Sequence, residues 1–303
     1  MDKIIAKIQA KLANKEDVLS ELAKFTNPEL NSFLLELFRI KSQRVNPSEV
    51  VKQFNKNRFV FPADTDILKL KKIEVEWLTY AEENGYKPLN LSPLAPFAAC
   101  SSVGLVNQNN VVTALRGTEV VSDATNVIAL KIASEFKAAK DRNLILKYST
   151  THRHIRGQYF SNPNFSAHFS VFCLVAGGLD NGNYEFEISQ LEEHIRIMFS
   201  LLKRRFNENQ LFIKFLVKEN SEQFHSILKQ RENLFWADKE VIFVEDFDNK
   251  YYKTIQYKIV IKKNNREIEI ADGGDVDWTQ KLLGNRKHRL FISGIGLDLM
   301  EKI

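Results

Sequence analysis

The chain has 303 residues, 44% of them hydrophobic, and a formal net charge of +5. This composition is typical of a folded globular protein, and the length allows one large α/β or α+β domain with a smaller appendage. The basic residues occur in short, scattered runs, which do not indicate a nucleic-acid-binding stripe. No apolar run approaches the length of a membrane span, and the amphipathic, lysine-interrupted N-terminus is unlike a signal peptide. We therefore expect a cytoplasmic protein with no membrane association.

The first part of the chain predicts a small helical region. Residues 1–45 have the spacing of two amphipathic helices, the first with a stripe that begins at Ile4 and the second with Pro28 at its first turn. The segment Arg44–Ser48 (RVNPS) has the composition of a linker. We therefore divide the chain into a helical N-terminal region, residues 1–58, and a main domain, residues 59–303.

The main domain mixes helical and strand patterns without regular β-α-β alternation, which favours an antiparallel α+β sheet flanked by helices. Asp66 can cap a helix that Gly85 closes, and Ser122 or Asp123 can cap another. The remaining elements are expected, in chain order, as an extended proline-rich segment at 87–97, strands at 111–116 and 184–188, a helix opened by a capping box at 189–192, a strand at 211–217, a helix at 221–231, a strand at 240–247, a hairpin around Asn264-Asn265, and a strand running into a Gly-x-Gly turn and a helix at 289–303.

A long hairpin between Leu144 and Gly178 is the centre of this pattern. Its arms are rich in β-branched and aromatic residues, and Asn162, Pro163 and Asn164 supply turn chemistry between them. The second arm is apolar on both faces, which predicts a central strand.

The first arm of the hairpin carries polar residues at period 2, namely His152, His154, Arg156 and Gln158. Residues two apart on a strand share a face, so these four form either the floor of a site or the solvated face of an edge strand. His152 and His154 could hold a metal together with His168, but no carboxylate or cysteine of suitable spacing joins them, and we assign no metal site. No nucleophile motif indicates a catalytic residue. The cysteines, Cys100 and Cys173, are too isolated to indicate a disulfide framework or a cysteine-rich zinc site.

Several segments in order resemble the catalytic domain of class II aminoacyl-tRNA synthetases, and the histidyl-tRNA synthetase branch most of all. Glu76–Leu94 looks like motif 1, a helix and strand ending in proline, and Ile155-Arg156-Gly157-Gln158 looks like the motif 2 signature Phe-Arg-x-Glu. Tyr251-Tyr252 with Gly273-Gly274 look like the tyrosines and Gly-Gly turn that line the family's amino-acid pocket, Gly294–Asp298 looks like motif 3, and Asp123-Ala124-Thr125 aligns with the family's Glu-Gly-Thr.

The resemblance spans residues 59–303 and implies a class II fold, a homodimer formed through motif 1, and a site for an amino acid and ATP with Mg²⁺. It assigns the substrate-binding residues as Asp123, Thr125, Tyr251, Tyr252, Gly273 and Gly274, and the nucleotide-binding residues as Arg156, Gln158, Gly294 and Gly296. The chemistry is consistent with these roles. A carboxylate and a hydroxyl suit an ammonium group, an arginine can bind a phosphate through two parallel hydrogen bonds, and a glutamine amide can bind an adenine edge.

The departures from the family bear on the function. The arginine that ends motif 3 and grips the γ-phosphate in the family is replaced by Leu299, and the motif 2 glutamate is replaced by Gln158. The segment before the tyrosines (EDFDNKYY) lacks the arginine of the histidine-specific enzymes, and Asp275-Val276-Asp277 replaces the Arg-Tyr-Asp that follows Gly-Gly. The sequence also stops at motif 3, with no anticodon-binding domain behind it, so we do not expect tRNA charging.

Simpler interpretations remain open for several residues. Asp123 can serve as a helix cap alone, one of the paired tyrosines can be ordinary packing, and Gly273-Gly274 can be only a turn. Asp272, Asp275 and Asp277 indicate either an acidic solvent loop or a preference for a cationic ligand.

Three functions are consistent with these features. The first is a synthetase paralogue that binds an amino acid or related amine, with or without a nucleotide, and does not charge tRNA. The second is a non-catalytic regulatory subunit with an enzyme partner, similar to the regulatory subunit of ATP phosphoribosyltransferase. The third is an ATP-dependent amino-acid ligase or adenylating enzyme, which only Arg156 supports. The loss of the motif 3 arginine at Leu299 argues against ordinary ligase activity.

Overall fold

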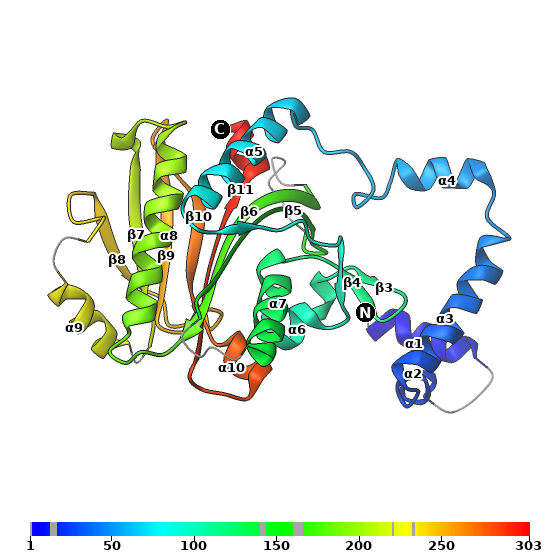
Figure 1. The fold of residues 1–303 in the computed structure, drawn as a ribbon. Coiled ribbons are helices and arrows are strands. Elements are labelled where there is room, and N and C mark those ends of the chain that lie inside the picture. The colour runs from blue at the N-terminus through cyan, green and yellow to red at the C-terminus, as the bar shows by residue number, and fades with distance from the viewer. Residues whose placement is uncertain (1, 13–16, 140–143, 160–165, 220, 232–233) are drawn as a thin grey trace.

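The computed structural model describes residues 2–12, 17–139, 144–159, 166–219, 221–231 and 234–303. Its centre is an eight-stranded sheet with the order β1-β5-β6-β11-β10-β9-β7-β8 (Figure 1). Neighbouring strands are antiparallel except in the edge pairs β1–β5 and β7–β8, which are parallel. The strands are β1 (Lys87–Pro88), β5 (Leu146–Ile155), β6 (His168–Leu179), β7 (Leu211–Val217), β8 (Val241–Glu245), β9 (Ile255–Lys263), β10 (Arg266–Val276) and β11 (His288–Gly296).

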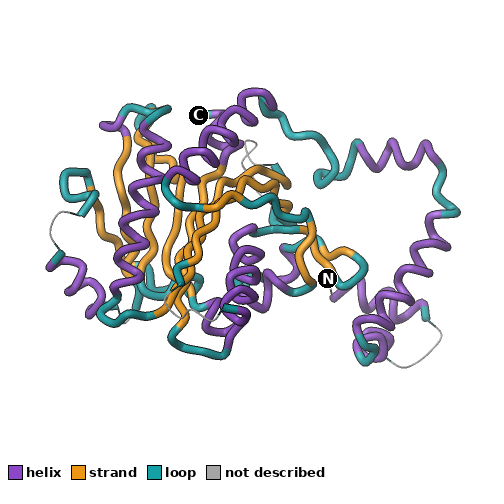
Figure 2. Tube along the Cα trace, viewed as in Figure 1, coloured by secondary structure: helices purple, strands orange, loops and turns teal. Residues whose placement is uncertain are grey.

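The predicted α+β architecture is therefore confirmed. The hairpin of β5 and β6 is the predicted one, and β6 is central because it pairs with β5 on one side and β11 on the other. Its predicted turn residues, 162–164, lie outside the described residues. A second, three-stranded sheet with the order β2-β4-β3 lies beside the main one (Figure 2), formed by β2 (Leu94–Pro96), β3 (Thr113–Ala114) and β4 (Thr118–Val120).

One face of the main sheet is covered by long helices. Helix α5 (Ile67–Glu83) begins at the predicted cap Asp66, whose carboxylate accepts the backbone N–H groups of Leu68 and Lys69. Together with α8 (Glu185–Lys203) and α9 (Glu222–Gln230) it buries the larger core, which includes Trp77, Phe172 and Leu191. Each such side chain contributes roughly 1.5–3 kcal/mol when it leaves water. The helices therefore cover this face of the sheet, and the core beneath them stabilises the domain.

The other face is covered only in part. Helices α6 (Ala99–Val103), α7 (Ala124–Ala138) and α10 (Trp278–Leu283) lie over it, with Ile128, Val175 and Ile292 in the shared core. The 3₁₀ turns η1 (Gln108–Asn110) and η2 (Glu208–Gln210) and the last helix, α11 (Leu297–Lys302), complete the elements. The uncovered part of this face, toward β9 and β10, is where a cavity forms.

The start of α8 corrects one prediction. Residues 184–188 are not a strand, and Ser189–Glu192 do not open a helix, because α8 begins four residues earlier at Glu185. The N-terminal flanking residue, Tyr184, has a left-handed backbone (φ 56°) and makes no side-chain cap. The alternation of Phe186 and Ile188 resembles a strand, although both are buried in the core beneath the helix.

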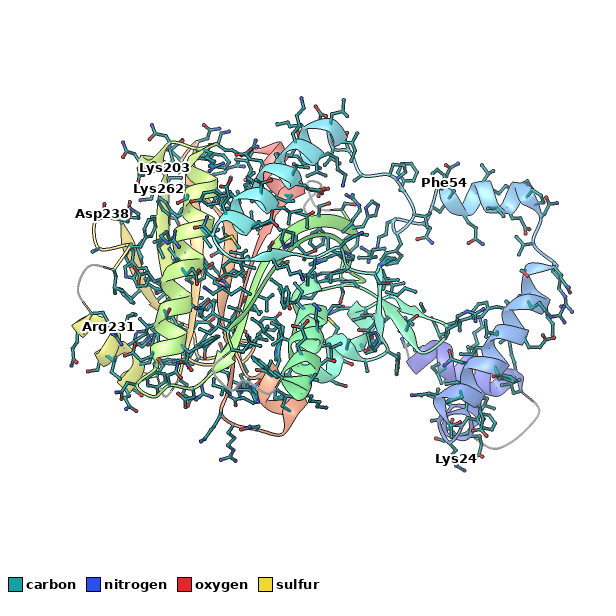
Figure 3. All side chains as sticks on the ribbon, in the orientation of Figure 1. Lys24, Phe54, Lys203, Arg231, Asp238 and Lys262 are labelled. Carbon is teal, nitrogen blue, oxygen red and sulfur yellow. The ribbon has the colours of Figure 1, made fainter. Side chains whose placement is uncertain are left out.

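The N-terminal region contains four helices in its described residues, where two helices and a linker were predicted: α1 (Asp2–Lys11), α2 (Val18–Ala23), α3 (Asn27–Ser42) and α4 (Pro47–Phe54). The last two residues of the predicted linker, Arg44–Ser48, begin α4, which Asn46 and Glu49 start with a capping box. Residues 43–46 separate α3 from α4, and a longer stretch without helix, 55–66, precedes α5. Helices α2, α3 and α4 contain no buried residue. Their side chains project into the surroundings, whereas those between α8 and the sheet are densely packed (Figure 3).

Among the described residues, Asn31 and Arg58 join this region to the main domain by hydrogen bonds. The side-chain oxygen of Asn31 on α3 accepts the backbone N–H groups of Arg116 and Gly117, in the turn between β3 and β4. Arg58 donates to the carbonyl oxygens of Gly157 and Gln158, just past the end of β5. The division of the chain at residues 58 and 59 stays a prediction, and its boundary residue is one of those in contact.

Candidate functional site

A cavity of about 470 Å³ lies on the partly covered face of the sheet. Its floor follows one row across the sheet, in which Cys173, Gly294, Asp272 and Lys258 are cross-strand neighbours. The N-terminus of α7 and the segment before β9 form the walls. The lining residues are Cys100, Val106, Asn110, Ser122, Asp123, Thr125, His154, Arg156, Gln158, Phe169, Val171, Cys173, Tyr251, Tyr252, Lys258, Glu269, Ile270, Ala271, Asp272, Ile292, Ser293, Gly294 and Gly296.

Three of the four polar residues predicted on the first hairpin arm line this cavity: His154, Arg156 and Gln158. His152 is on the same face of β5, two residues before His154, but lies outside the cavity lining. Strand β5 ends at Ile155, so Arg156 and Gln158 follow the strand and are not part of its ladder. The arm therefore lines a cavity, and its role in a binding site stays a prediction.

His154 is buried, and its ring joins β5 to helix α7. Its Nε2 accepts the backbone N–H of Ala124 at 3.0 Å, so the ring proton is on Nδ1. Burial lowers the pKa of His154 to about 3, and the imidazole is neutral near pH 7. No described residue pairs with Nδ1, so the cavity wall holds an unpartnered N–H donor.

Asp123 is the N-cap of α7, as predicted, and it also contacts the opposite wall. One carboxylate oxygen accepts the backbone N–H and the hydroxyl of Thr125, at 2.9 and 2.6 Å. The other accepts the hydroxyl of Tyr251 at 2.7 Å. Burial raises the pKa of Asp123, but the nearby His154 and Arg156 and these hydrogen bonds outweigh it, so the pKa lies below its ordinary value. Asp123 is therefore an ionised carboxylate that already has three donors.

Tyr252 faces a second carboxylate. Its hydroxyl donates to Asp272 at 3.1 Å, and its ring packs where Gly274 has no side chain. A Cβ on Gly274 would stand 2.6 Å from that ring, so the glycine makes room for the tyrosine. Burial raises the pKa of both Tyr251 and Tyr252 well above the ordinary value, so both hydroxyls stay protonated and act as donors.

Gly273 and Gly274 are not a turn, which corrects the prediction. They lie inside β10, paired with β9 and β11, and neither is among the described lining residues of the cavity. A Cβ on Gly273 would approach the Ser293 hydroxyl to 2.2 Å on the other face of the sheet. Both glycines allow close packing around the site, and a direct role in binding substrate stays a prediction.

The three aspartates near this strand do not crowd one another. Asp272 opens to the cavity, whereas Asp275 points to the other face and accepts the backbone N–H groups of Thr254 and Ile255. Asp277 forms ion pairs with Lys253 and Lys281. Of these three aspartates, only Asp272 therefore lines the cavity.

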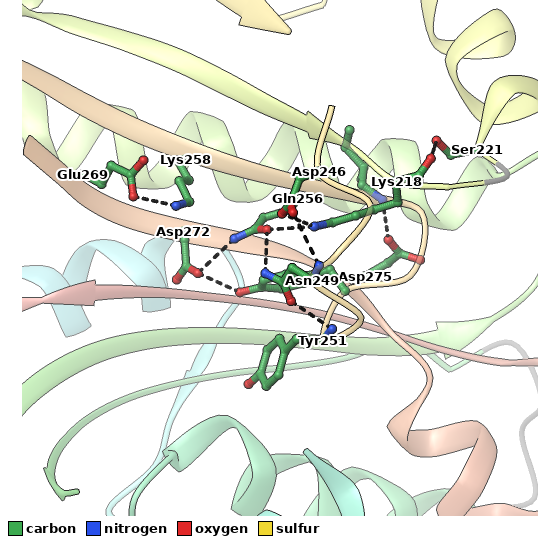
Figure 4. Close-up of polar contacts among 12 residues, drawn as sticks. Lys218, Ser221, Asp246, Asn249, Tyr251, Gln256, Lys258, Glu269, Asp272 and Asp275 are labelled. Carbon is green, nitrogen blue, oxygen red and sulfur yellow. Dashed lines mark hydrogen bonds and ion pairs between the residues drawn. The ribbon is translucent and has the colours of Figure 1, made fainter. Parts of the chain in front are cut away.

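A buried lysine holds the segment that carries the two tyrosines. The Lys218 ammonium, 4% exposed, pairs with Asp246 at 2.8 Å and donates to the Gln256 side-chain oxygen at 3.1 Å (Figure 4). Asn249 donates to the same Gln256 oxygen and accepts the backbone N–H of Tyr251. No local pattern indicates this role for Lys218, because its partners lie 28 and 38 residues away.

The glycines of motif 3 shape the floor. Gly294 and Gly296 both line the cavity, as predicted. A Cβ on Gly294 would have 3.3 Å to the nearest atom, a methyl group of Val171, so a larger side chain could fit only by filling the cavity. Nucleotide binding by these glycines stays a prediction.

The motif 3 position lacks the cation that the resemblance expects, and binding of ATP with Mg²⁺ stays a prediction. Leu299, in α11, stands where the resemblance expects a cation. Arg156 is engaged by the protein: its Nε donates to the Ser122 carbonyl at 3.1 Å and its guanidinium lies 5.3 Å from the centre of the Phe169 ring. Within the described ranges no group of three histidine, cysteine, aspartate or glutamate side chains could hold a metal ion.

Sequence reasoning missed several lining residues. Lys258 on β9 and Glu269 on β10 form an ion pair of 2.5 Å at the edge of the cavity. Cys100 contacts the Ser122 hydroxyl at 2.9 Å, and burial raises its pKa to about 11; burial also raises the pKa of Cys173. Both thiols are free and buried. Only the i, i+2 alternation along β9 could have pointed to Lys258.

No protein-family model matches the chain, and no curated protein matches it by sequence. Solved structures do match. Apo histidyl-tRNA synthetase of S. aureus superimposes with a TM-score of 0.56 at 14% identity, over 80% of this chain and 70% of that one. The ATP phosphoribosyltransferase regulatory subunit/histidyl-tRNA synthetase of Bacillus halodurans superimposes with a TM-score of 0.58 at 15% identity, over 80% of this chain and 81% of that one. The fold is that of the class II aminoacyl-tRNA synthetases.

The class II fold extends beyond the histidyl branch. Pyrrolysyl-tRNA synthetase from Desulfitobacterium hafniense matches 97% of this chain and 84% of its own length, with a TM-score of 0.51 and 11% identity. The resemblance drawn from the sequence motifs is thus confirmed at the level of fold. None of the helices built from described residues is long and apolar enough to cross a membrane.

Proposed function

We propose that this class II-like chain binds an amino acid or related amine in the cavity and does not charge tRNA. The hydrogen bond between Tyr251 and Asp123, two residues 128 positions apart, carries the proposal. It supports a single site built from the residues that the resemblance assigns to amino-acid binding, since Thr125 and Tyr252 line the same cavity. A carboxylate ringed by neutral donors in a concave, partly apolar site suits an ammonium group.

The proposal that the chain does not charge tRNA rests on the missing cation at the motif 3 position. A guanidinium on the transferred phosphates is a large part of the electrostatic stabilisation in such reactions, and Leu299 offers none. We therefore expect no aminoacylation of tRNA. The assay is charging of total tRNA with a mixture of labelled amino acids, with an active synthetase as control. Charging by this chain would overturn that part of the proposal.

Ligand binding is tested by thermal unfolding with a panel of amino acids and amines, each with and without Mg-ATP. A ligand that binds only the folded state must raise the midpoint in proportion to the logarithm of its concentration. We expect a shift with at least one amine and a weakened shift in Asp123→Asn, which keeps a capping oxygen but removes the charge. Asp238→Asn, at an exposed position, is the matched control. Equal titrations in wild type and Asp123→Asn would contradict the assignment of Asp123.

The same ligand panel also tests the alternative that the chain is an ATP-dependent ligase or adenylating enzyme. A midpoint shift with Mg-ATP, followed by release of pyrophosphate or AMP with some acceptor, would favour an adenylating enzyme. We expect neither, because Leu299 stands at the motif 3 position, where the family's arginine grips the γ-phosphate.

A second candidate function is that of a non-catalytic regulatory subunit. The exposed apolar side chains of the N-terminal helices favour it, since Ile4 (65%), Leu19 (54%) and Phe38 (53%) face solvent there. One structural neighbour bears the name of a regulatory subunit. The test is co-expression with a candidate enzyme and light scattering of the purified pair. A complex of defined mass whose activity responds to the amine would favour this function.

We also propose a homodimer through the motif 1 segment. Helix α5, whose last part belongs to the motif 1 segment, exposes Leu68 (73%) and Val75 (66%) just before that segment, an apolar surface that a second copy could cover. Sedimentation velocity on wild type and Val75→Lys tests this. We expect a dimer that dissociates in the variant, and a wild-type monomer at all concentrations would contradict it.

A further inference from the structure

The two carboxylates of the cavity differ in how their charge is balanced. Asp123 has the Arg156 guanidinium nearby, and its two oxygens already accept three hydrogen bonds from Thr125 and Tyr251. A carboxylate has about four acceptor positions, so at most one remains for a ligand. Asp123 can therefore bind one donor group but has little further capacity.

The Asp272 carboxylate accepts fewer hydrogen bonds than the Asp123 carboxylate. It forms no ion pair with any residue in the described part of the chain, and its donors are neutral: the Tyr252 hydroxyl at 3.1 Å and the Gln256 amide at 3.5 Å. The cation beside it, Lys258, is paired with Glu269 at 2.5 Å (Figure 4). The surrounding sheet raises the pKa of the Asp272 carboxyl, although Lys258 and Arg156 partly oppose the shift and the side chain is exposed at the cavity. Asp272 is therefore an exposed carboxylate at the cavity that has no ion pair among the described residues.

The structure also fixes the orientation of this carboxylate. The Gln256 side-chain oxygen faces two donors, Lys218 and Asn249, so its amide nitrogen must face Asp272. Gln256 is 3% exposed and Lys218 is 4% exposed, so neither can reorient freely. A carboxylate held by buried neutral donors and open to a cavity is built to receive a cation from outside the chain.

A second feature on the opposite wall indicates that the cavity receives a polar ligand. The His154 ring is 1% exposed, lines the cavity, and carries an N–H on Nδ1 that no described residue accepts. A buried unpartnered donor is costly unless something else accepts from it. With Arg156 beside it, this wall offers positive and donor groups that suit a ligand carboxylate, whereas the Asp272 wall is negative.

We propose that Asp272 binds a cationic side-chain group of the ligand, so that the cavity selects a basic amino acid over a neutral one of the same shape. This inference rests on the proposed function and adds to it a substrate class and a specificity-determining residue. The α-amino group stays with Asp123 and Thr125, and the carboxylate lies toward Arg156. Asp272 then discriminates by charge at the far end of the side chain.

The test measures dissociation constants by calorimetry for matched ligand pairs. L-lysine and L-ornithine are compared with L-norleucine and L-norvaline, which keep the chain but lack the distal ammonium; L-arginine and L-histidine complete the panel. We expect at least one basic ligand to bind about tenfold or more tightly than its neutral partner, the usual value of a charge-assisted hydrogen bond. In Asp272→Asn that ratio should fall to near one, while the affinity for the neutral partner is unchanged. Asp238→Asn serves as the control.

The outcomes separate this inference from the proposal beneath it. If neutral and basic partners bind wild type equally, the inference is overturned and amine binding stands. If the ratio persists in Asp272→Asn, Asp272 is not the selector, and the inference is overturned as well. If no compound of the panel binds at any concentration, the proposed function fails together with the inference. The comparison of ligands on the wild-type chain needs no variant, so misfolding of Asp272→Asn does not remove the test.

Discussion

Tyr251 and Tyr252 are adjacent in the chain, with ring centres 4.9 Å apart and planes at 75°, yet their hydroxyls serve two different carboxylates. Tyr251 donates to Asp123 at the start of α7, and Tyr252 donates to Asp272 in β10. One dipeptide thus links the helix that walls the cavity to the strand that floors it.

Replacing each tyrosine by phenylalanine tests its contact with its own carboxylate separately. Tyr251→Phe leaves Asp123 with its two bonds from Thr125, so we expect a loss of about 1 kcal/mol in unfolding free energy and weaker binding of every amine. Tyr252→Phe leaves Asp272 with Gln256 alone, and the effect should appear mainly with basic ligands. Urea unfolding and calorimetry with a basic and a neutral amino acid check this. The same ligand profile in both variants would contradict separate roles for the two tyrosines.

The glycines of the floor and of the adjoining strand predict opposite phenotypes. Gly294→Val should fill the cavity and abolish ligand binding with little loss of stability, because the nearest contact of its Cβ, at 3.3 Å, is a side-chain methyl. Gly273→Ala should destabilise by about 1–3 kcal/mol, since its Cβ would stand 2.6 Å from the Ile292 carbonyl oxygen. Thermal unfolding and ligand titration of both variants distinguish the effects. Ligand binding retained in Gly294→Val would mean that the ligand lies elsewhere.

The ion pair between the buried Lys218 and the partly exposed Asp246 predicts coupling between the two residues. Lys218→Met removes the cation and leaves Asp246 and the Gln256 oxygen facing an apolar side chain, so we expect a loss of roughly 2–4 kcal/mol. Asp246→Asn in the same chain should recover part of that loss. A double-mutant cycle by urea unfolding measures the coupling, and additive effects would show that the pair does not act as a unit. Amine affinity should fall with Lys218→Met, because the tyrosine-bearing segment loses its anchor.

Two buried histidines predict an acid-sensitive fold. Burial lowers the pKa of His154 and His194 from 6.5 to about 3, so between these values the unfolded chain binds more protons than the folded one. Stability is therefore full above pH 6.5 and falls as the pH drops toward 3, by about 1.4 kcal/mol per pH unit for each histidine. Urea unfolding at pH 7, 6 and 5 measures the slope. His194→Gln should take up about one proton fewer on unfolding, and an unchanged slope would contradict the assignment.

The sequence predicted those features that depend on local chemistry. Asp66 and Asp123 cap the helices they were expected to cap, and Asn264 and Asn265 turn the β9–β10 hairpin with φ of 50° and 57°. Caps and tight turns are set by residues a few positions apart, so a pattern in the chain is enough to find them.

Features that depend on distant partners could not be found in this way. Gly273-Gly274 has the composition of a turn, but pairing with β9 and β11 makes it a strand. Asp272 and Asp275 look equivalent in sequence, and only the sheet shows that one faces the cavity and the other the opposite core. Lys218 follows an apolar strand with no local sign of its role, because its partners come from β9 and from the segment that precedes it.

The contact made by Arg58 bears on how the chain can be shortened. Its guanidinium donates to the carbonyl oxygens of Gly157 and Gln158, and it lies against the rings of Phe59 and Tyr159. Trimming the helical region to begin at Phe59 would strip both carbonyls of a donor at the entrance to the cavity, whereas a chain that begins a few residues earlier keeps them. Two truncations that differ by so little would then give one protein with an intact entrance and one with an altered entrance, and binding data from the shorter form would describe a different pocket.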